Sequence, residues 1–580
     1  MNLFSFLEDR VREALAGLVE QGVLPTDLPP PKWVVEPPRD ASHGQAATNA
    51  ALVLAKPAGR PPLTIAEPLA AALARMPGIA TAEVAKPGFV NLRLDDTLFH
   101  DVVRAVLQDG RRFGRIDVGK GERVNVEYCS ANPTGPLHVG HGRGTVYGDA
   151  LASVLAAVGY DVTREYYVND GGAQIEVLAR SAHHRYLEAL DERPGPMPEG
   201  YYPGDYLVPV GRALAERDGD RWRDAEEADW LEPIGAFAID AMMDLIRSDL
   251  AAVRVRHDVF TSEAALAAAG VVAECVEALR GRDLVYTGTL EPPKGKPVED
   301  WEPRPQLLFR ATRFGDDTDR PLQRSTGDWT YFANDIGNHY DKFRRGFAEM
   351  VDVWGADHGG YVKRMQAGVA GITGGKGRLE VKLCQLVQLM DGGQPMKMSK
   401  RAGRIVTLRD VVDEVGADVF RFIMLTRKND AALEFDLQKV MEQSKDNPVF
   451  YVQYAHARIC SVFRNAEGAG IAVGDSADAA LDRLADDGEI GVMEQLALFP
   501  RTLELAALHR EPHRLAFYLE GLAGAVHRLW TRGKEDDALR FVRLDDVPLT
   551  ESRLALLAAA RHVLAGGLEL LGVDPVEAMH

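Results

Sequence analysis

Two histidines separated by two residues, His138 and His141, stand among glycines at 140, 142 and 144. The stretch lies between a predicted strand and a predicted helix, where backbone N–H groups and the helix dipole attract phosphate. The glycines let a ligand approach the backbone closely. Imidazoles in this position can donate hydrogen bonds to phosphate oxygens on which charge develops during a displacement. The pattern indicates phosphate chemistry, and the competing interpretation is two helix-capping or solvated histidines.

A second group follows far downstream, where Lys397, Met398, Ser399 and Lys400 come after a Gly-Gly-Gln-Pro stretch at 392–395. Two lysines three residues apart on such a loop can close over a triphosphate and neutralise the charge that builds on departing pyrophosphate. Alone, the pair would be ordinary solvated surface. Together with the histidine pair, it indicates a nucleotide site assembled from two distant segments.

Composition limits what else the chain can be. Its 580 residues carry 86 Asp and Glu against 67 Lys and Arg, a net charge of −19, and 46% are hydrophobic. About three domains fit this length. The acidity excludes a general polyanion-binding surface, so a nucleic-acid partner must be met on local basic patches. No apolar run reaches the roughly 18–20 residues of a membrane span, no signal peptide is recognisable, and four cysteines without a CxxC pair argue against disulfides and structural zinc. We expect a reduced, cytoplasmic protein.

The elements that must position these groups fall into three parts. Residues 1–108 predict a small α+β domain, with a helix over 46–55 and strands over 81–84 and 89–94. Residues 109–436 begin with a strand at 124–128, the histidine turn, a helix, a strand at 162–168 and another helix, an order typical of a Rossmann-like, doubly wound parallel sheet. Within this part, 191–230 is expected to be an insertion or exposed connection. Residues 437–580 carry helical periodicity only, which predicts an all-α domain. The fold class is therefore multidomain α/β.

The paired motifs resemble the HIGH and KMSK signatures of class I aminoacyl-tRNA synthetases, and longer strings resemble the arginyl-tRNA synthetase family. The strings that carry the second resemblance lie at 126–141, 167–174, 202–206, 328–336 and 553–573. The resemblance implies ATP-dependent attachment of L-arginine to tRNA(Arg) through an arginyl-adenylate, with release of pyrophosphate and AMP. It also makes 1–108 a tRNA-binding additional domain, 109–436 the catalytic domain and 437–580 the anticodon-binding domain.

By the same resemblance, His138, His141, Lys397 and Lys400 are the catalytic residues. The residues expected to bind ATP, as its Mg²⁺ complex, are Gly140, Gly142, Gly144, Met398, Ser399, Asp357 and His358. Many family members carry a lysine where this chain has Gly135, together with a degraded KMSK loop. Because the loop is intact here, Lys400 should matter more than in those relatives.

A buried guanidinium needs carboxylates in planar geometry to offset its desolvation, which offers a check on the amino acid. Glu127 ends the strand before the histidine turn, and Asp335 lies one helical turn after Tyr331. The resemblance implies that these three residues hold the arginine side chain, while Ser130, Asn132 and His141 hold its α-amino and carboxylate ends. The competing interpretation of each carboxylate is a surface salt bridge or a helix cap.

For tRNA, the resemblance places Phe89 and Asn91 against the outer corner of the molecule, where an aromatic face can stack on a base and an amide can read its edge. Phe89 as a core residue is the alternative. Contacts expected along one face of the helical domain are Tyr451, Tyr454, His456, Arg458 and Arg464, although helical spacing makes some of these simply core. Arginine, ATP and tRNA(Arg) are the expected partners of a monomer without a structural metal or membrane contact.

Three other interpretations stay open. Another class I synthetase, of the cysteinyl or glutamyl type, is disfavoured by the missing zinc-ligand cysteines and the extra N-terminal domain. A small-molecule nucleotidylyltransferase would have no need of a helical domain at 437–580. A catalytically silent RNA-binding paralogue would not need the intact histidine and lysine pairs.

Overall fold

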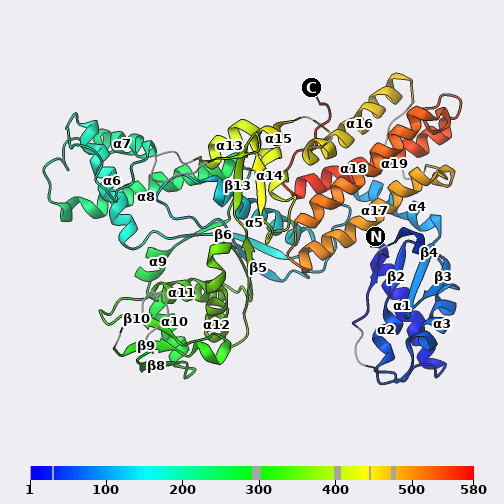
Figure 1. Ribbon diagram of the computed structural model, residues 1–580, viewed down its shortest axis with the longest axis horizontal. Coiled ribbons are helices and arrows are strands. Elements are labelled where there is room, and N and C mark those ends of the chain that lie inside the picture. The colour runs from blue at the N-terminus through cyan, green and yellow to red at the C-terminus, as the bar shows by residue number, and fades with distance from the viewer. Residues whose placement is uncertain are drawn as a thin grey trace.

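The computed structural model describes residues 2–28, 32–38, 40–290, 302, 304–396, 406–442, 444, 446–471 and 479–579. Lys397, Met398, Ser399 and Lys400 lie outside the described residues. Figure 1 shows an N-terminal domain in blue, a central α/β unit with a helical projection, and a helical bundle in orange and red. Among the described residues, no helix combines the length and apolar character that a membrane span requires.

A five-stranded parallel sheet forms the centre of the α/β unit. In spatial order its strands are β12 (Arg378–Cys384), β11 (Glu349–Gly355), β5 (Arg123–Glu127), β6 (Asp161–Val168) and β7 (Val259–Ser262). Helix α5 (Val139–Ala157) connects β5 to β6, and α12 (Val362–Thr373) connects β11 to β12. The chain order reverses between β5 and β11, so the carboxyl ends of these two strands flank the topological switch point where ligands bind in such sheets. The predicted doubly wound sheet is confirmed.

Two insertions extend this sheet. The first packs α6 (Ala173–Ala189), α7 (Val208–Asp218) and α8 (Glu227–Ala252) around a hydrophobic cluster of its own and projects away from the helical bundle (Figure 1). Sequence reasoning treated 191–230 as an insertion or exposed connection. The insertion is present, but α7 within it is an ordered helix, because Val210 and Leu214 are buried on one side of it.

The second insertion lies between β7 and β11. It contains α9 (Glu263–Ala268), α10 (Val271–Arg280) and α11 (Tyr331–Arg344), together with a small antiparallel sheet. The strands of that sheet are β8 (Val285–Gly288), β9 (Gln306–Phe309) and β10 (Arg320–Gln323). Helix α11 packs against α10 and α12, and its end leads directly into β11, so its polar residues reach the switch point.

The N-terminal domain contains two helices, α1 (Leu3–Glu20) and α3 (Pro62–Leu73), and an antiparallel sheet. The strands of the sheet are β1 (Val35–Glu36), β2 (Ala46–Thr48), β4 (Phe89–Leu94) and β3 (Ile79–Ala85), in that order. The single helix predicted over 46–55 is wrong: β2 comes first and α2 (Ala50–Ala55) follows. Alanine favours a helix locally, but residues 46–48 take strand conformation because Ala46 pairs with Leu92 and Thr48 pairs with Val90 in the antiparallel sheet.

Four long helices make up the C-terminal bundle: α16 (Pro448–Gly468), α17 (Asp487–Leu508), α18 (His513–Glu535) and α19 (Val547–Leu570). The predicted all-α domain is confirmed. Helix α4 (Asp96–Asp109) follows the N-terminal sheet and packs against α17 and α19 (Figure 1). The N-terminal domain is therefore attached to the bundle through this helix.

Between the parallel sheet and the bundle lies a joining region. It comprises β13 (Val387–Asp391), β14 (Gln394–Pro395), α13 (Leu408–Val415), α14 (Ala417–Met424), β15 (Leu433–Asp436) and α15 (Leu437–Met441). Two buried arginines connect α5 to this region. Arg143 donates to the carbonyls of Ala431 at 2.6 Å, Lys428 at 2.7 Å and Gln385 at 3.1 Å.

Arg421, on α14, is fully buried and is the second of these arginines. Its guanidinium donates to Asp149 of α5 at 2.5 Å, to the Val253 carbonyl after α8 at 2.7 Å and to the Leu571 carbonyl after α19 at 2.7 Å. One side chain thus joins the histidine-bearing helix, the first insertion and the last helix of the bundle.

Replacing Arg421 by Met should lower the free energy of unfolding by about 3–5 kcal/mol, because Oδ2 of Asp149 and the carbonyls of Val253 and Leu571 all lose this donor. Urea unfolding followed by tryptophan fluorescence measures the change. Arg427→Met, at an exposed position of the same region, should change it by less than about 0.5 kcal/mol. Equal effects of the two substitutions would contradict the joining role of Arg421.

Candidate active site

The chain turns sharply after β5. Cys129 and Ser130 both have positive φ, 71° and 37°, a conformation that costs a non-glycine residue on the order of 1 kcal/mol or more. The turn brings the Ser130 hydroxyl to within 3.1 Å of Glu127 Oε1, to which it donates, and the backbone N–H of Tyr167 on β6 donates to the Ser130 oxygen at 3.1 Å. The strained turn thus fixes Ser130 between the ends of two strands.

His138 and His141 stack at the start of α5, with ring centroids 3.7 Å apart. Nδ1 of His138 accepts from the Gly140 N–H at 3.1 Å, and Nδ1 of His141 accepts from the His138 N–H at 3.3 Å. Since both Nδ1 atoms accept, each neutral ring carries its proton on Nε2, where it can donate to a phosphate oxygen. The helix-capping interpretation therefore holds for both histidines, which form a capping box, and it is compatible with the proposed phosphate role.

The three glycines of this motif differ in their surroundings. A Cβ at Gly140 would lie 2.9 Å from the His138 ring, and one at Gly142 would lie 2.5 Å from Phe420 of α14. Gly144 has more space, with Val353 at 3.8 Å. Gly142 is therefore required for packing of α5 against α14, and ATP contacts of the three glycines stay predictions.

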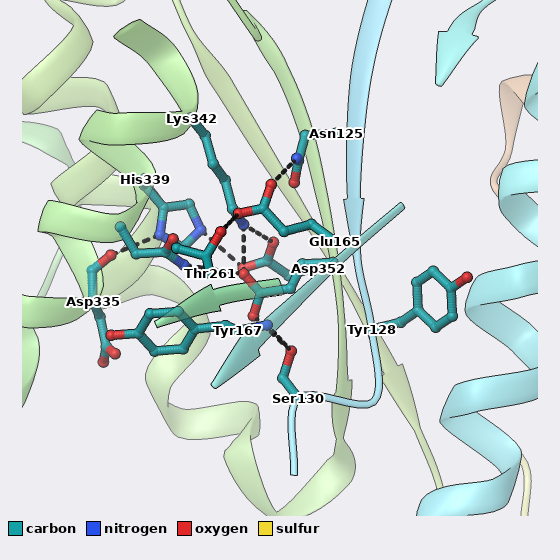
Figure 2. Close-up of polar contacts among 12 residues, drawn as sticks. Asn125, Tyr128, Ser130, Glu165, Tyr167, Thr261, Asp335, His339, Lys342 and Asp352 are labelled. Carbon is teal, nitrogen blue, oxygen red and sulfur yellow. Dashed lines mark hydrogen bonds and ion pairs between the residues drawn. The ribbon is translucent and has the colours of Figure 1, made fainter. Parts of the chain in front are cut away.

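The carboxyl ends of β5 and β11 bring two acidic side chains together. Glu127 and Asp352 are register partners on these parallel strands, and both are buried. Lys342 of α11 lies between them, with Nζ 2.6 Å from Glu127 Oε2 and 3.4 Å from Asp352 Oδ1 (Figure 2). Burial opposes the charge of Lys342, but Asp352 and Glu127 outweigh it and raise its pKa. Asn338 also donates to Glu127 Oε2, at 3.1 Å.

His339 completes the charge balance around Asp352. Its Nε2 lies 2.9 Å from Asp352 Oδ2 and its Nδ1 lies 2.8 Å from the Asp335 carbonyl, so both nitrogens face acceptors. Burial alone would lower the pKa of His339, but Asp352 outweighs it and the net shift is upward. Glu165 of β6 is likewise neutralised, by both of its oxygens accepting from Arg345 at 2.8 Å.

Asp335 differs from these three carboxylates. Among the described residues, its carboxylate makes one hydrogen bond, accepted from the Tyr361 hydroxyl at 2.6 Å, and no ion pair. Burial, with too little compensation from Tyr361 and His339, raises its pKa to about 7. Asp335 is therefore a carboxyl group poised to ionise when a cation arrives, which is the behaviour that a guanidinium site requires.

The other residues predicted for this site are more exposed. Tyr331, one turn before Asp335 on α11, is 48% exposed. Asn132 donates to the Gln174 side chain at 2.8 Å and is exposed. Asp357 and His358 follow the carboxyl end of β11, with side chains 71% and 63% exposed. All of them lie on elements that reach the switch-point edge of the sheet, and their contacts with ligands stay predictions.

Sequence reasoning missed Tyr167, Glu165, Asn338, His339, Lys342 and Asp352. One signal was available for part of this set. Asp335, His339 and Lys342 lie at i, i+4 and i+7 on one face of the predicted helix. A polar stripe of this kind next to a recognised site residue predicts a buried network when the helix faces a sheet edge. Glu165 and Asp352 gave no such signal, because each shares its strand with another acidic residue, Asp161 or Glu349, and the strand sequence does not show which of the two is buried.

The residues predicted to contact tRNA lie in two places. Phe89 is 40% exposed and shares one face of β4 with the half-buried Asn91, while Val90 and Leu92 are buried on the other. The alternative of Phe89 as a core residue is wrong. In the bundle, His456 is 2% exposed and bonds the Val576 carbonyl, so it is core.

An aromatic and cationic surface borders α16 and α18. Arg458 lies over the Tyr454 ring at 4.1 Å and over the Trp530 ring at 5.3 Å, and Tyr454 is 44% exposed. A cavity of about 260 Å³ is lined by Tyr454, Arg458, Arg464, Trp530 and Lys534 among others. A second, of about 210 Å³, shares Trp530 and Lys534. Tyr451 is half-buried against His527, at 4.6 Å between ring centroids.

Comparison with known proteins agrees with this geometry. Three family models match the chain: the arginyl-tRNA synthetase N-terminal domain over residues 5–94, the class I (R) tRNA synthetase catalytic domain over 102–194, and the DALR anticodon-binding domain over 452–579. The arginine–tRNA ligases of Roseobacter denitrificans and Parvibaculum lavamentivorans are 57% and 55% identical to it, over 100% of each chain. The arginyl-tRNA synthetase structure from Thermus thermophilus has the same fold, with a TM-score of 0.72, 22% identity and 100% of both chains covered.

A doubly wound sheet with stacked histidines at the switch point and a helical tRNA-binding bundle define a class I aminoacyl-tRNA synthetase. Full-length identity of 55–57% to curated arginine–tRNA ligases shows which family within this class the chain belongs to. The chain belongs to the arginyl-tRNA synthetase family.

Replacing Lys342 by Met should lower the free energy of unfolding by about 3–5 kcal/mol, because Glu127 then has no cation partner among the described residues and Asp352 keeps only His339. The pair should take up a proton in the folded state, so the folded variant binds more protons than the unfolded chain. The stability of the variant should then fall as pH rises from about 5 to 8. Urea unfolding across this pH range measures both effects.

Lys376→Met, at an exposed lysine, is the matched control and should show neither effect. A pH-independent loss of stability in the Lys342 variant would mean that the two carboxylates are not coupled through this lysine.

Proposed function

We propose that the chain attaches L-arginine to tRNA(Arg) with the residues assembled at this sheet edge. The arginine carboxylate attacks the α-phosphorus of ATP, a new P–O bond gives arginyl-adenylate, and the bond to the β-phosphate oxygen breaks to release pyrophosphate. A hydroxyl of the terminal adenosine of tRNA then attacks the carbonyl carbon, and AMP leaves. The observation that carries the proposal is Asp335, a buried carboxyl group with no cation partner among the described residues, whereas Glu127 and Glu165 are paired with Lys342 and Arg345.

In this proposal Asp335 is the main partner of the guanidinium. Glu127 contributes less, since Lys342 and Asn338 already donate to its Oε2 and Ser130 donates to Oε1. One lone pair on Oε1 is left for the substrate. Tyr331 borders the side chain from α11, and Ser130, Asn132 and His141 are the proposed partners of the α-amino and carboxylate ends.

The phosphates are assigned to the helix that begins at His138. Nε2–H of His138 and His141 would donate to phosphate oxygens, and the positive end of the α5 dipole supports the same charge. ATP enters as its Mg²⁺ complex, as a substrate. The described residues contain no group of three or more His, Cys, Asp or Glu side chains arranged to hold a metal ion. Lys397 and Lys400 are proposed to stabilise the departing pyrophosphate.

For tRNA, exposed aromatic faces support two contact regions. Phe89 with Asn91 suits a base in the outer corner of tRNA, and Tyr454 with Arg458 and Trp530 suits bases of the anticodon loop. Stacking of a base on an aromatic ring does not depend on the charge of the protein, so the net acidity of the chain does not oppose it. The domain limits 1–108, 109–436 and 437–580, a monomeric state and a cytoplasmic location belong to the same proposal.

The decisive experiment is aminoacylation of total tRNA with each of the 20 amino acids, with purified full-length protein and ATP. Charging with arginine alone is expected. Charging with another amino acid would refute the specificity, and folded protein that charges with none would favour the silent RNA-binding paralogue.

Arginine affinity should depend on pH through Asp335. Because the raised pKa of about 7 belongs to the form without arginine, the carboxylate is protonated below pH 7 and the guanidinium must first displace that proton. The KM for arginine should be about tenfold higher at pH 6 than at pH 8. Asp335→Asn should raise the KM for arginine by about thirtyfold or more at pH 8. The same substitution should abolish the change of this KM between pH 6 and pH 8. Aminoacylation at saturating ATP and tRNA measures both effects. A KM that stays constant from pH 6 to 8 in the parent protein would exclude this role.

Tyr454→Ala should raise the KM for tRNA(Arg) about tenfold, the effect of losing one base stack of roughly 1–3 kcal/mol, and should leave the KM values for arginine and ATP unchanged. Phe517→Ala is the matched control, since Phe517 is also an exposed aromatic of the bundle, at 46%, but lines neither cavity. An equal effect of both substitutions would mean that the surface around Trp530 has no special part in tRNA binding.

A further inference from the structure

Tyr167 is the last residue but one of β6, at the carboxyl edge of the sheet, and is only 8% exposed. Its hydroxyl is buried and has no hydrogen-bond partner among the residues that the structure describes. Buried tyrosine hydroxyls elsewhere in this sheet are satisfied: Tyr166 donates to the Ala131 carbonyl at 2.7 Å and Tyr128 donates to Asp149 at 3.3 Å. Because buried polar groups are almost always paired, and the interaction of this hydroxyl with Glu263 does not reach hydrogen-bond geometry, the phenolic oxygen is open to a ligand at this edge.

The surroundings of this hydroxyl are acidic. Figure 2 shows the Tyr167 ring between Ser130 and Asp335, with its oxygen directed toward the Asp335 carboxylate. Burial raises the pKa of Tyr167, and the carboxylates of Asp335, Glu263 and Glu127 raise it further. The phenol therefore stays protonated, and it has one hydrogen to donate and lone pairs with which to accept.

Glu263, at the start of α9, offers a direction for that hydrogen. Its Oε1 accepts from the Asn334 side chain at 2.8 Å, which holds the carboxylate in place beside α11. Burial raises the pKa of Glu263, and the Asn334 amide and the Tyr167 hydroxyl offset part of that rise. With its hydrogen turned toward Glu263, the phenol presents its lone pairs toward Asp335.

We propose that Tyr167 contacts the substrate directly, with its phenolic oxygen accepting an N–H from the arginine guanidinium that Asp335 holds. The inference rests on the proposed function and extends it to a specificity-determining residue. A guanidinium has five N–H donors in one plane. Asp335 and the remaining lone pair of Glu127 cannot accept from all five, since Tyr361, Lys342, Asn338 and Ser130 already occupy part of their acceptors.

This contact favours arginine over lysine for a geometric reason. The ammonium of lysine is a compact charge with three donors, which Asp335 can attract but which cannot reach Asp335, Glu127 and Tyr167 together. An acceptor that only the planar, five-donor group can satisfy is then left unpaired by the wrong substrate, and an unpaired buried group gives strong discrimination.

Tyr167→Phe tests the inference, with Tyr166→Phe as the matched control. Removing the Tyr167 hydroxyl should raise the KM for arginine about ten- to a hundredfold, as expected for a hydrogen bond to a charged group, with kcat and the KM values for ATP and tRNA within twofold of the parent. The thermal unfolding midpoint should fall less than in Tyr166→Phe, because the lost hydroxyl makes no hydrogen bond of normal geometry with the described residues. Tyr166→Phe removes a satisfied hydrogen bond and should lower that midpoint without changing the KM for arginine.

Two competing ligands separate a direct contact from a general disturbance of the site. Inhibition by agmatine, which has the guanidinium but no carboxylate, should weaken by the same factor as arginine in the Tyr167 variant. Inhibition by norvaline, which has the amino and carboxylate groups but no guanidinium, should be unchanged. An unchanged KM for arginine, or equal weakening of agmatine and norvaline, would overturn the inference. Absence of arginine charging by the parent protein would instead overturn the proposed function.

Discussion

The ion pair of Lys342 with Glu127 and Asp352 is the interaction on which the catalytic edge depends. Parallel strands β5 and β11 lie side by side at the switch point, and the register partners Glu127 and Asp352 on them are both buried and acidic. Two carboxylates in register would repel each other and oppose the pairing of the two strands. Lys342 places one cation between the two side chains, and it does so from α11, so the position of that helix is fixed by the same contact. Asp335, two turns earlier on α11, is thereby held at the edge without a cation of its own.

A second constraint connects this edge to the helical bundle. Helix α5 begins at the stacked histidines, and further along it carries Asp149, which accepts from the buried Arg421. The same guanidinium holds carbonyls that follow α8 and α19. A displacement of the bundle relative to the sheet would therefore strain the helix that carries His138 and His141. The glycine at 142 lets α5 approach α14 closely, so the histidine motif serves the packing of the joining region in addition to its proposed contact with the nucleotide.

Sequence alone predicted the parallel sheet, the histidine turn and the helical bundle, because each has a periodic or local signal. It placed Asp335 and Glu127 in one site through a family resemblance, but it could not show that they differ in charge compensation. That difference depends on Lys342, whose partners are 215 and 10 residues away in the chain. Acidic strand residues such as Glu165 and Asp352 carry no sequence signal of burial. Local propensity also failed over 46–55, where pairing with β4 overrode the helix preference of alanine.

The net charge of −19 suggests at first a protein unsuited to nucleic acid. The arrangement of side chains resolves the difficulty without a large basic surface. Around Trp530, Arg458 is stacked on Tyr454 and its Nη1 lies 2.9 Å from His527 Nδ1, so this cation is held in place before any ligand arrives. Arg464 and Lys534 border the same cavity. A few oriented cations next to exposed rings can combine stacking with short-range phosphate contacts, while acidic surfaces elsewhere disfavour other orientations of a polyanion. If tRNA binds at this surface as proposed, the overall acidity supports selectivity, because attraction is confined to the places where a base can also stack.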